Sequence, residues 1–129
     1  MAIPLWLVLL MSAVIGLLVG SFLATAVLRV PKRQPIVVAR SACPSCGHLL
    51  TPRELVPVLS WAVQGGRCRA CDVRISPYYA IMEIASASIA VAGAWWTPWP
   101  DFVGVWFVGW AALCLIAWRL RELPFVKKG

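Results

Sequence analysis

Three long apolar segments limit what this chain can fold into. Residues 3–28 and residues 102–118 contain no charged side chain, and residues 77–96 contain only Glu83. A helix needs roughly 20 apolar residues to cross a bilayer, with about 17 as the lower limit. The composition agrees, because 61% of the residues are hydrophobic and only 13% are charged. We therefore predict an all-α polytopic membrane protein with three transmembrane helices.

The positions of the basic residues predict how the chain is oriented. Eight of the 12 Lys and Arg residues lie between Arg29 and Arg74, and the other four follow residue 118. The positive-inside rule then puts the N-terminus outside and both basic segments in the cytoplasm. Topology thus accounts for the net charge of +7. We expect no nucleic acid partner, although Arg67, Arg69 and Arg74 could contact phosphates.

A cleaved signal peptide is the alternative for residues 1–26, because Ala24, Thr25 and Ala26 are typical of a cleavage site. However, no basic residue precedes the apolar segment, which is longer than the core of about 7–15 residues found in signal peptides. Cleavage there would also export a basic loop against the charge rule. We therefore favour a first transmembrane helix.

Four cysteines in the loop between the first two apolar segments predict a metal site. Cys43 and Cys46 form one Cys-x-x-Cys pair, and Cys68 and Cys71 form another. Each pair offers two thiolates, and two pairs complete a tetrahedral four-sulfur zinc site. Such a site has no open position, so the zinc is structural and stabilises a loop too small for its own core. Two disulfides are the alternative, but the reducing cytoplasm favours zinc.

Two other potential ligands receive simpler interpretations. His48 follows the first cysteine pair and could replace one cysteine, but with four cysteines present we expect a surface or hydrogen-bonding role. Cys114 lies in the third apolar segment, where we expect it to be a small packing residue.

Local signals divide the cysteine loop into short pieces. Thr51, Pro52 and Glu54 fit the N-terminus of a helix, with Thr51 as the cap and Glu54 closing a capping box. Gly65 and Gly66 end this segment and lead into the second cysteine pair. The chain thus divides into a first transmembrane helix (1–28), a cytoplasmic zinc-ribbon loop domain (29–76), two further transmembrane helices (77–118) and a basic tail (119–129).

Small and aromatic residues predict helix contacts in the membrane. Gly16 and Gly20 form a Gly-x-x-x-Gly motif, which allows a close approach between helices. Trp106 and Trp110 share one face of the third helix, where we expect them to pack.

Glu83 is a candidate functional residue, because a carboxylate within a membrane segment is costly to bury. The alternative is that Glu83 lies near the cytoplasmic interface and pairs with Arg29 or Arg74. The sequence leaves both interpretations open.

Six motifs in a fixed order resemble one known family. They are Gly16-Leu-Leu-Val-Gly20-Ser21-Phe22-Leu23, Arg29-Val-Pro31, Arg40-Ser-Ala-Cys43-Pro-Ser-Cys46-Gly47-His48, Glu54-Leu-Val-Pro57-Val-Leu-Ser60-Trp61, Gly65-Gly66-Arg67-Cys68-Arg-Ala-Cys71, and Ile75-Ser76 with Tyr79 to Glu83. Together they resemble the N-terminal, methyltransferase-associated, four-cysteine domain of the type IV prepilin peptidases, over about residues 14–90.

This resemblance implies a role in pilin processing at the bacterial inner membrane. Members of the family cleave the positively charged leader of prepilins with an intramembrane aspartyl protease. They then methylate the new pilin N-terminus with S-adenosylmethionine, an activity associated with the cysteine loop. The implied substrates are pilins of type IV pili or pseudopilins of type II secretion.

The chain departs from the family at positions that matter for cleavage. Ala24 stands where the family usually has Asn, and residues 115–119 contain no counterpart of the first catalytic aspartate. The second aspartate would lie beyond the end of the chain. Asp72 and Asp101 are the only aspartates, and they do not supply the carboxylate pair that activates water. We therefore expect no aspartyl endopeptidase activity from this chain alone.

Two hypotheses for the activity follow. In the first, the chain is an N-methyltransferase-type domain, in which Glu83 holds or deprotonates the substrate ammonium. Gly65 and Gly66 would then allow close approach of S-adenosylmethionine, whereas the alternative is that they only form a turn. In the second hypothesis the chain is not catalytic, and its zinc loop binds pilin leaders or a separate peptidase chain. The missing aspartates and the missing Asn at Ala24 favour the second.

Overall fold

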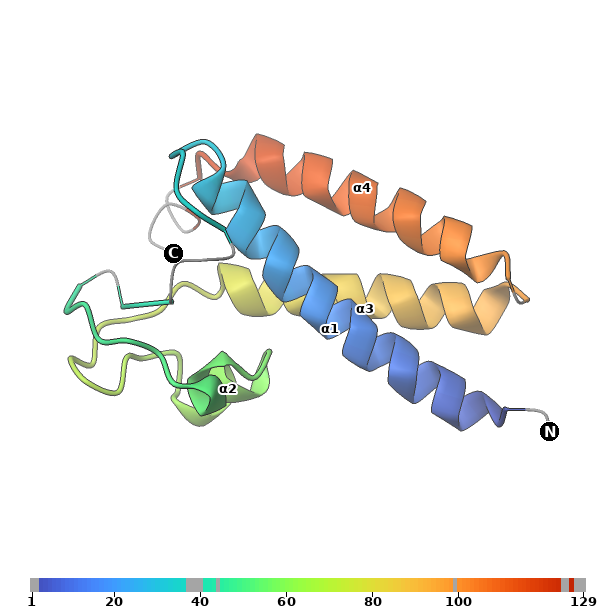
Figure 1. Cartoon of the computed structure of the whole chain (residues 1–129), viewed down its shortest axis with the longest axis horizontal. Coiled ribbons are helices and arrows are strands. Elements are labelled where there is room, and N and C mark those ends of the chain that lie inside the picture. The colour runs from blue at the N-terminus through green and yellow to red at the C-terminus, as the bar shows by residue number, and fades with distance from the viewer. Residues whose placement is uncertain (1–2, 37–40, 44, 99, 124–125, 127–129) are drawn as a thin grey trace.

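A computed structural model of the chain describes residues 3–36, 41–43, 45–98, 100–123 and 126 (Figure 1). Parts of the predicted loop domain and of the basic tail, including Arg40, Lys127 and Lys128, lie outside these described residues. The elements in chain order are α1 (Leu5–Arg29), the 3₁₀ turn η1 (Pro52–Leu55), α2 (Leu59–Val63), α3 (Tyr78–Trp96) and α4 (Phe102–Leu120).

The predicted all-α fold with three membrane-capable helices is confirmed. α1, α3 and α4 are each long and apolar enough to cross a membrane. Their bounds differ from the prediction by only a few residues. α1 begins at Leu5 because Pro4 occupies the cap position, and α4 continues to Leu120 and includes Arg119 in its last turn. A basic side chain there is favourable for the helix dipole.

Exposed apolar side chains surround the three helices, as a bilayer environment requires. Phe107 is 67% exposed and Leu115 is 69% exposed on α4, and Leu18 is 58% exposed on α1. Helices suit this environment because they satisfy their own backbone hydrogen bonds within the bilayer. These side chains therefore face lipid.

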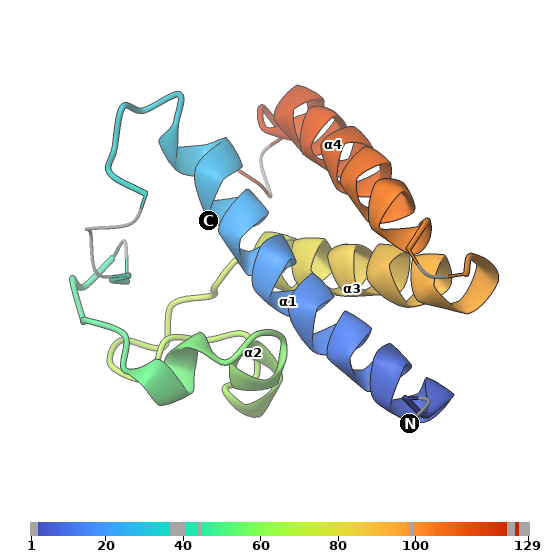
Figure 2. The same ribbon diagram turned by 45° about the vertical axis from the view of Figure 1, so that its right-hand side comes forward.

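α1 crosses α3, and α4 lies beside the pair, as both views show (Figures 1 and 2). The C-terminal ends of α1 and α4 and the N-terminal end of α3 lie at the same end of the bundle, next to the cysteine loop. There the three helices share a buried cluster of Ala24, Val27, Leu28, Tyr78, Met82, Ala117 and Val126.

Glycine allows the backbones of α1 and α3 to touch. A Cβ atom on Gly16 would lie 2.5 Å from the Cα atom of Ala87, and one on Gly20 would lie 2.6 Å from the Cα atom of Glu83. Both distances are too short for any side chain. The predicted close approach at the Gly-x-x-x-Gly motif is therefore confirmed, with α3 as the partner.

Two tryptophans join α4 to α3. The indole N–H of Trp106 donates to the carbonyl oxygen of Ala90 at 2.8 Å, and that of Trp110 donates to Ser86 at 3.3 Å. The predicted packing role is confirmed. Because an indole N–H needs an acceptor when it is buried, these bonds also fix where α4 lies along α3.

The helical piece that starts at Thr51 and Pro52 is short. η1 is a single 3₁₀ turn, and Val56 already has extended backbone angles (φ −65°, ψ 118°). Pro57 explains this, because the residue before a proline is sterically kept out of the helical region. The segment then turns at Val58 and forms only the five residues of α2.

Candidate metal centre

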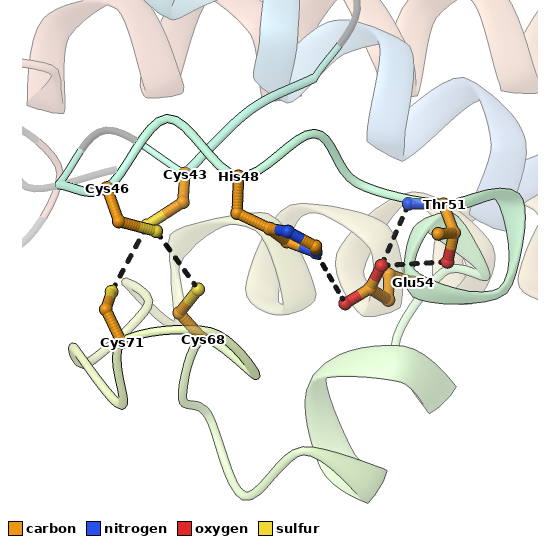
Figure 3. A network of polar contacts seen from close by, with 7 residues as sticks. All are labelled: Cys43, Cys46, His48, Thr51, Glu54, Cys68 and Cys71. Carbon is orange, nitrogen blue, oxygen red and sulfur yellow. Dashed lines mark hydrogen bonds and ion pairs between the residues drawn. The ribbon is translucent and has the colours of Figure 1, made fainter.

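The four predicted cysteines come together in one cluster (Figure 3). All four sulfur atoms lie within 4.8 Å of one another, with Cys43 Sγ 3.8 Å from Cys71 Sγ and Cys46 Sγ 3.9 Å from Cys68 Sγ. Four sulfurs bound at about 2.3 Å around a tetrahedral zinc ion would be about 3.8 Å apart. All five cysteines of the chain are thiols, so the alternative of two disulfides is not what the structure forms. The cluster can hold one metal ion.

The backbone around the first cysteine pair forms a tight turn. The N–H of Cys43 donates to the carbonyl of His48, and the N–H of Gly47 donates back to the carbonyl of Cys43, both at 2.9 Å. An antiparallel bridge between Ala42 and Leu49 closes the turn. These bonds hold both thiols of the pair on the same side of the loop.

The second cysteine pair repeats this pattern bond for bond. The N–H of Cys68 donates to Val73, and the N–H of Asp72 donates to Cys68, again at 2.9 Å. Arg67 and Arg74 form the equivalent bridge. Two copies of one turn therefore face each other, and each supplies half of a tetrahedral donor set.

Each turn needs a left-handed residue directly after its second cysteine. Gly47 has φ +71° at this position and Asp72 has φ +58°. Glycine adopts this conformation without steric cost, whereas other residues lose roughly 1–2 kcal/mol, with asparagine and aspartate best tolerated. The first turn uses glycine, and the second uses a tolerated substitute.

We expect Gly47→Ala to weaken metal binding by roughly tenfold, because alanine adds about 1–2 kcal/mol of backbone strain at this φ. Competition with a chelator of known affinity would measure the change. Gly47→Asn is the matched control, because it also adds a side chain but tolerates the left-handed region. Equal losses in the two variants would mean that the side chain itself, and not backbone strain, disturbs the turn.

Backbone amides and neighbouring thiols make the four sulfurs unequal. Hydrogen bonds from the N–H groups of Cys46 and Ser45 lower the pKa of Cys43 to about 6. The N–H of Val73 lowers the pKa of Cys71, but partial desolvation and hydrogen bonding with the other three thiols outweigh this and raise it to about 12. A bound cation would displace the protons of these thiols, so metal binding depends on pH.

His48 lies beside the cluster but is turned towards a carboxylate (Figure 3). Its Nε2 atom lies 3.6 Å from Oε1 of Glu54. Oε2 of Glu54 accepts the backbone N–H of Thr51 at 2.9 Å and the Thr51 hydroxyl at 2.8 Å. The Thr51 N–H, the Thr51 hydroxyl and His48 together lower the pKa of Glu54. The predicted capping box is confirmed, and His48 makes a polar contact of the expected kind.

Gly65 and Gly66 form a turn that leads into the second cysteine pair. Both have positive φ, +58° and +68°. The Gly66 carbonyl accepts the N–H of Ile75 at 2.7 Å, and a Cβ on Gly66 would lie 2.9 Å from the ring of Trp61. The turn interpretation thus has direct support. A role for these glycines in binding S-adenosylmethionine stays a prediction.

Glu83 lies outside the cysteine cluster and has an unexpected partner. Its side chain is buried, with the residue 6% exposed, and Oε2 accepts the backbone N–H of Val58 at 2.6 Å. Within the described residues Glu83 takes part in no ion pair. The expected alternative of pairing with Arg29 or Arg74 is therefore wrong, because the carboxylate points at the turn around Val58. A catalytic role for Glu83 stays a prediction.

Two features of the site were missed from sequence. Asp72 occupies the position of Gly47 in the second turn, and the equal offset from the two cysteine pairs is a signal that could have shown this. Val58 has φ +57°, which nothing in a valine between Pro57 and Leu59 suggests.

Comparisons with known proteins identify relatives for most of this region. Residues 14–97 match the model of the Bacterial Peptidase A24 N-terminal domain family. A protein of Myxococcus xanthus is 47% identical over 79 residues, which are 61% of this chain and 24% of that protein. A protein of Bacillus subtilis is 43% identical over 79 residues, covering 61% of this chain and 32% of that protein. A third, from Pseudomonas aeruginosa, is 30% identical and covers 89% of this chain and 45% of its own length.

All three relatives carry the name Prepilin leader peptidase/N-methyltransferase. The chain spans less than half the length of each of them. No solved structure matches it significantly.

Proposed function

Because the chain belongs to the family of bacterial peptidase A24 N-terminal domains, we propose that it is a membrane module of pilin processing. The observation that carries this proposal is that the matched residues 14–97 contain the whole four-cysteine cluster, all of α3 and the part of α1 that follows residue 13. The relatives over this region are named for both leader cleavage and N-methylation. Its substrates would be pilins or pseudopilins.

The metal in this proposal is one structural zinc ion, held by Cys43, Cys46, Cys68 and Cys71. The sulfur spacing and the donor set fit zinc, which prefers four thiolates in a closed tetrahedral site. Zinc would supply no reaction chemistry here, because four sulfurs leave no open position. It would tie the two turns of the loop into one domain.

We also propose the orientation that the charges indicate, in a bacterial inner membrane, with the N-terminus outside and the cysteine loop and tail in the cytoplasm. The three helix ends next to the basic loop and tail lie at the same end of the bundle (Figure 1). One membrane face therefore receives the positive charge, which supports this orientation. In it, residues 29–76 act as a cytoplasmic loop domain and residues 119–129 as a cytoplasmic tail.

The activity we propose for this module is N-methylation of a processed pilin. S-adenosylmethionine would supply the methyl group, and the chain would hold the new N-terminal amine next to it. Methyl transfer to an amine depends mainly on such positioning. Glu83, Gly65 and Gly66 remain the candidate residues for substrate and cofactor.

A non-catalytic role is the second candidate, and contacts at two of these residues favour it. Oε2 of Glu83 already accepts the N–H of Val58, and the ring of Trp61 covers Gly66. In this case the zinc loop would bind pilin leaders or a separate peptidase chain without methylating anything.

Transfer of labelled methyl from S-adenosylmethionine to a pre-cleaved pilin peptide, in membranes that contain the chain, separates the two candidates. We expect label on the peptide amine, lost in Cys43→Ser and kept in Cys114→Ser, because only the first change disturbs the loop. Loss in Glu83→Gln would add Glu83 to the mechanism. A zinc-loaded protein that transfers no label would contradict the methyltransferase and leave the partner-binding role.

A further inference from the structure

Val58 forms a strained turn at the centre of the cysteine loop. Its backbone angles are φ 57° and ψ −49°, and the N–H of Leu59 donates to the carbonyl of Pro57 at 2.5 Å. This is a γ-turn of the rare form whose central residue has positive φ. A β-branched residue in this region is a genuine outlier and persists only where its surroundings hold it.

Glu83 contacts this turn from α3. The turn presents the Val58 N–H to α3, where Oε2 of Glu83 accepts it at 2.6 Å. A low local dielectric makes a hydrogen bond stronger than the same bond in water. The bond joins positions 25 residues apart, so it links the loop to a membrane helix.

We infer that Glu83 is a positioning residue, which docks the four-cysteine loop on the α1–α3 pair through the N–H of Val58. The helix contact places Glu83 for this role, because Gly20 lets α1 approach the Glu83 backbone closely. The inference goes beyond the proposed function, since it requires neither methyl transfer nor a particular substrate.

A second carboxylate continues the connection to the metal centre. His48, in the first cysteine turn, contacts Glu54, which caps η1 through Thr51. η1 ends at Leu55, only three residues before Val58. The cysteine cluster is therefore connected to α3 through two contacts to buried carboxylates, one at Glu54 and one at Glu83, with a short backbone segment between them.

The loop could also be held without the hydrogen bond, in either of two ways. Val58 borders an open apolar groove together with Leu17 of α1 and Ile84 of α3, so its side chain alone could hold the loop. Alternatively, the negative charge of Glu83 could act at a distance, whether or not it reaches the N–H. These cases are separated by variants that change, one at a time, the charge of Glu83, the length of its side chain, and the side chain of Val58.

Amide hydrogen exchange of Val58, in the zinc-loaded full chain in lipid nanodiscs, tests the inference. We expect Glu83→Ala to speed exchange of this amide by about tenfold, because the N–H loses its hydrogen-bond acceptor. Glu83→Gln keeps the length of the side chain and an acceptor oxygen, so the Val58 amide should retain most of its protection from exchange. Glu83→Asp keeps the charge but is too short, and should lose most of it. Unchanged exchange at residues 90–96 of α3 would show that the helix is intact.

Three results would overturn the inference. The first is unchanged Val58 exchange in Glu83→Ala. The second is a Val58 amide that is better protected in Glu83→Asp than in Glu83→Gln. The charge of the side chain, and not its length, would then hold the loop. The third comes from Val58→Gly, which keeps the N–H and tolerates positive φ, so that we expect exchange within a few-fold of the parent chain. A loss as large as that of Glu83→Ala would show that the valine side chain holds the loop.

Discussion

Zinc binding is expected to be lost when Cys43 or Cys68 is replaced by serine, and to be unchanged when Cys114 is replaced. A serine hydroxyl stays protonated at neutral pH and is a poor zinc ligand. Each of the first two changes therefore leaves three sulfurs for a closed four-coordinate site. The zinc affinity should fall by more than the roughly 10–100-fold that is lost when a residue hydrogen-bonded to a metal ligand is removed. Zinc content after purification, followed by chelator competition, would measure it.

Alkylation of the exposed thiols provides an independent readout. Cys46 and Cys71 are exposed, whereas Cys43 and Cys68 are buried, so a thiol reagent should reach the first two whenever no metal protects them. We expect slow labelling in the zinc-loaded parent and fast labelling in Cys43→Ser. Equal zinc content in Cys43→Ser and the parent chain would show that the cluster is not the metal site.

Gly20→Leu is expected to separate α1 from α3 and to unfold the bundle or trap it in a looser state. Even a Cβ atom at this position would lie 2.6 Å from the Cα atom of Glu83 and 2.7 Å from the carbonyl oxygen of Met82. Backbone atoms cannot move aside as a flexible side chain can. Overpacking typically costs about 1–3 kcal/mol, and a leucine against backbone should reach the upper end. Resistance to unfolding by a denaturing detergent would measure the loss.

Gly104→Leu is the matched control for this prediction. Gly104 is an exposed residue of α4, and a Cβ atom there would meet nothing within 4 Å. The same substitution should therefore leave detergent resistance close to that of the parent. Equal destabilisation by the two leucines would contradict the account, because it would show that glycine matters for helix formation and not for the α1–α3 contact.

The features that depend on local spacing could be predicted from the sequence. Apolar segments of sufficient length indicated the three helices, and the spacing of the cysteines indicated a shared site. The Gly16 and Gly20 spacing indicated a helix contact, although only the structure shows that α3 is the partner. These signals are readable because each contains a recognisable local pattern, namely a long apolar segment, a Cys-x-x-Cys pair or a Gly-x-x-x-Gly motif.

The features that depend on packing could not be predicted. The contact between Glu83 and Val58 joins a membrane helix to a loop 25 residues away, and neither residue type indicates the other. Sequence reasoning left open whether Glu83 is functional or pairs with an arginine, because charge pairing is a usual way to bury a carboxylate. The structure uses a backbone N–H, which has no sequence signature. For the same reason the strain at Val58 was not foreseen.

X-ray absorption at the zinc edge, on the purified chain, tests the central claim most directly. The account predicts one zinc per chain with four sulfur neighbours at about 2.3 Å and no nitrogen or oxygen neighbour. A nitrogen in the first shell would place His48 at the metal and contradict the four-cysteine site. A protein without zinc whose four cysteines are joined in two disulfides would contradict both the metal centre and the cytoplasmic position of the loop.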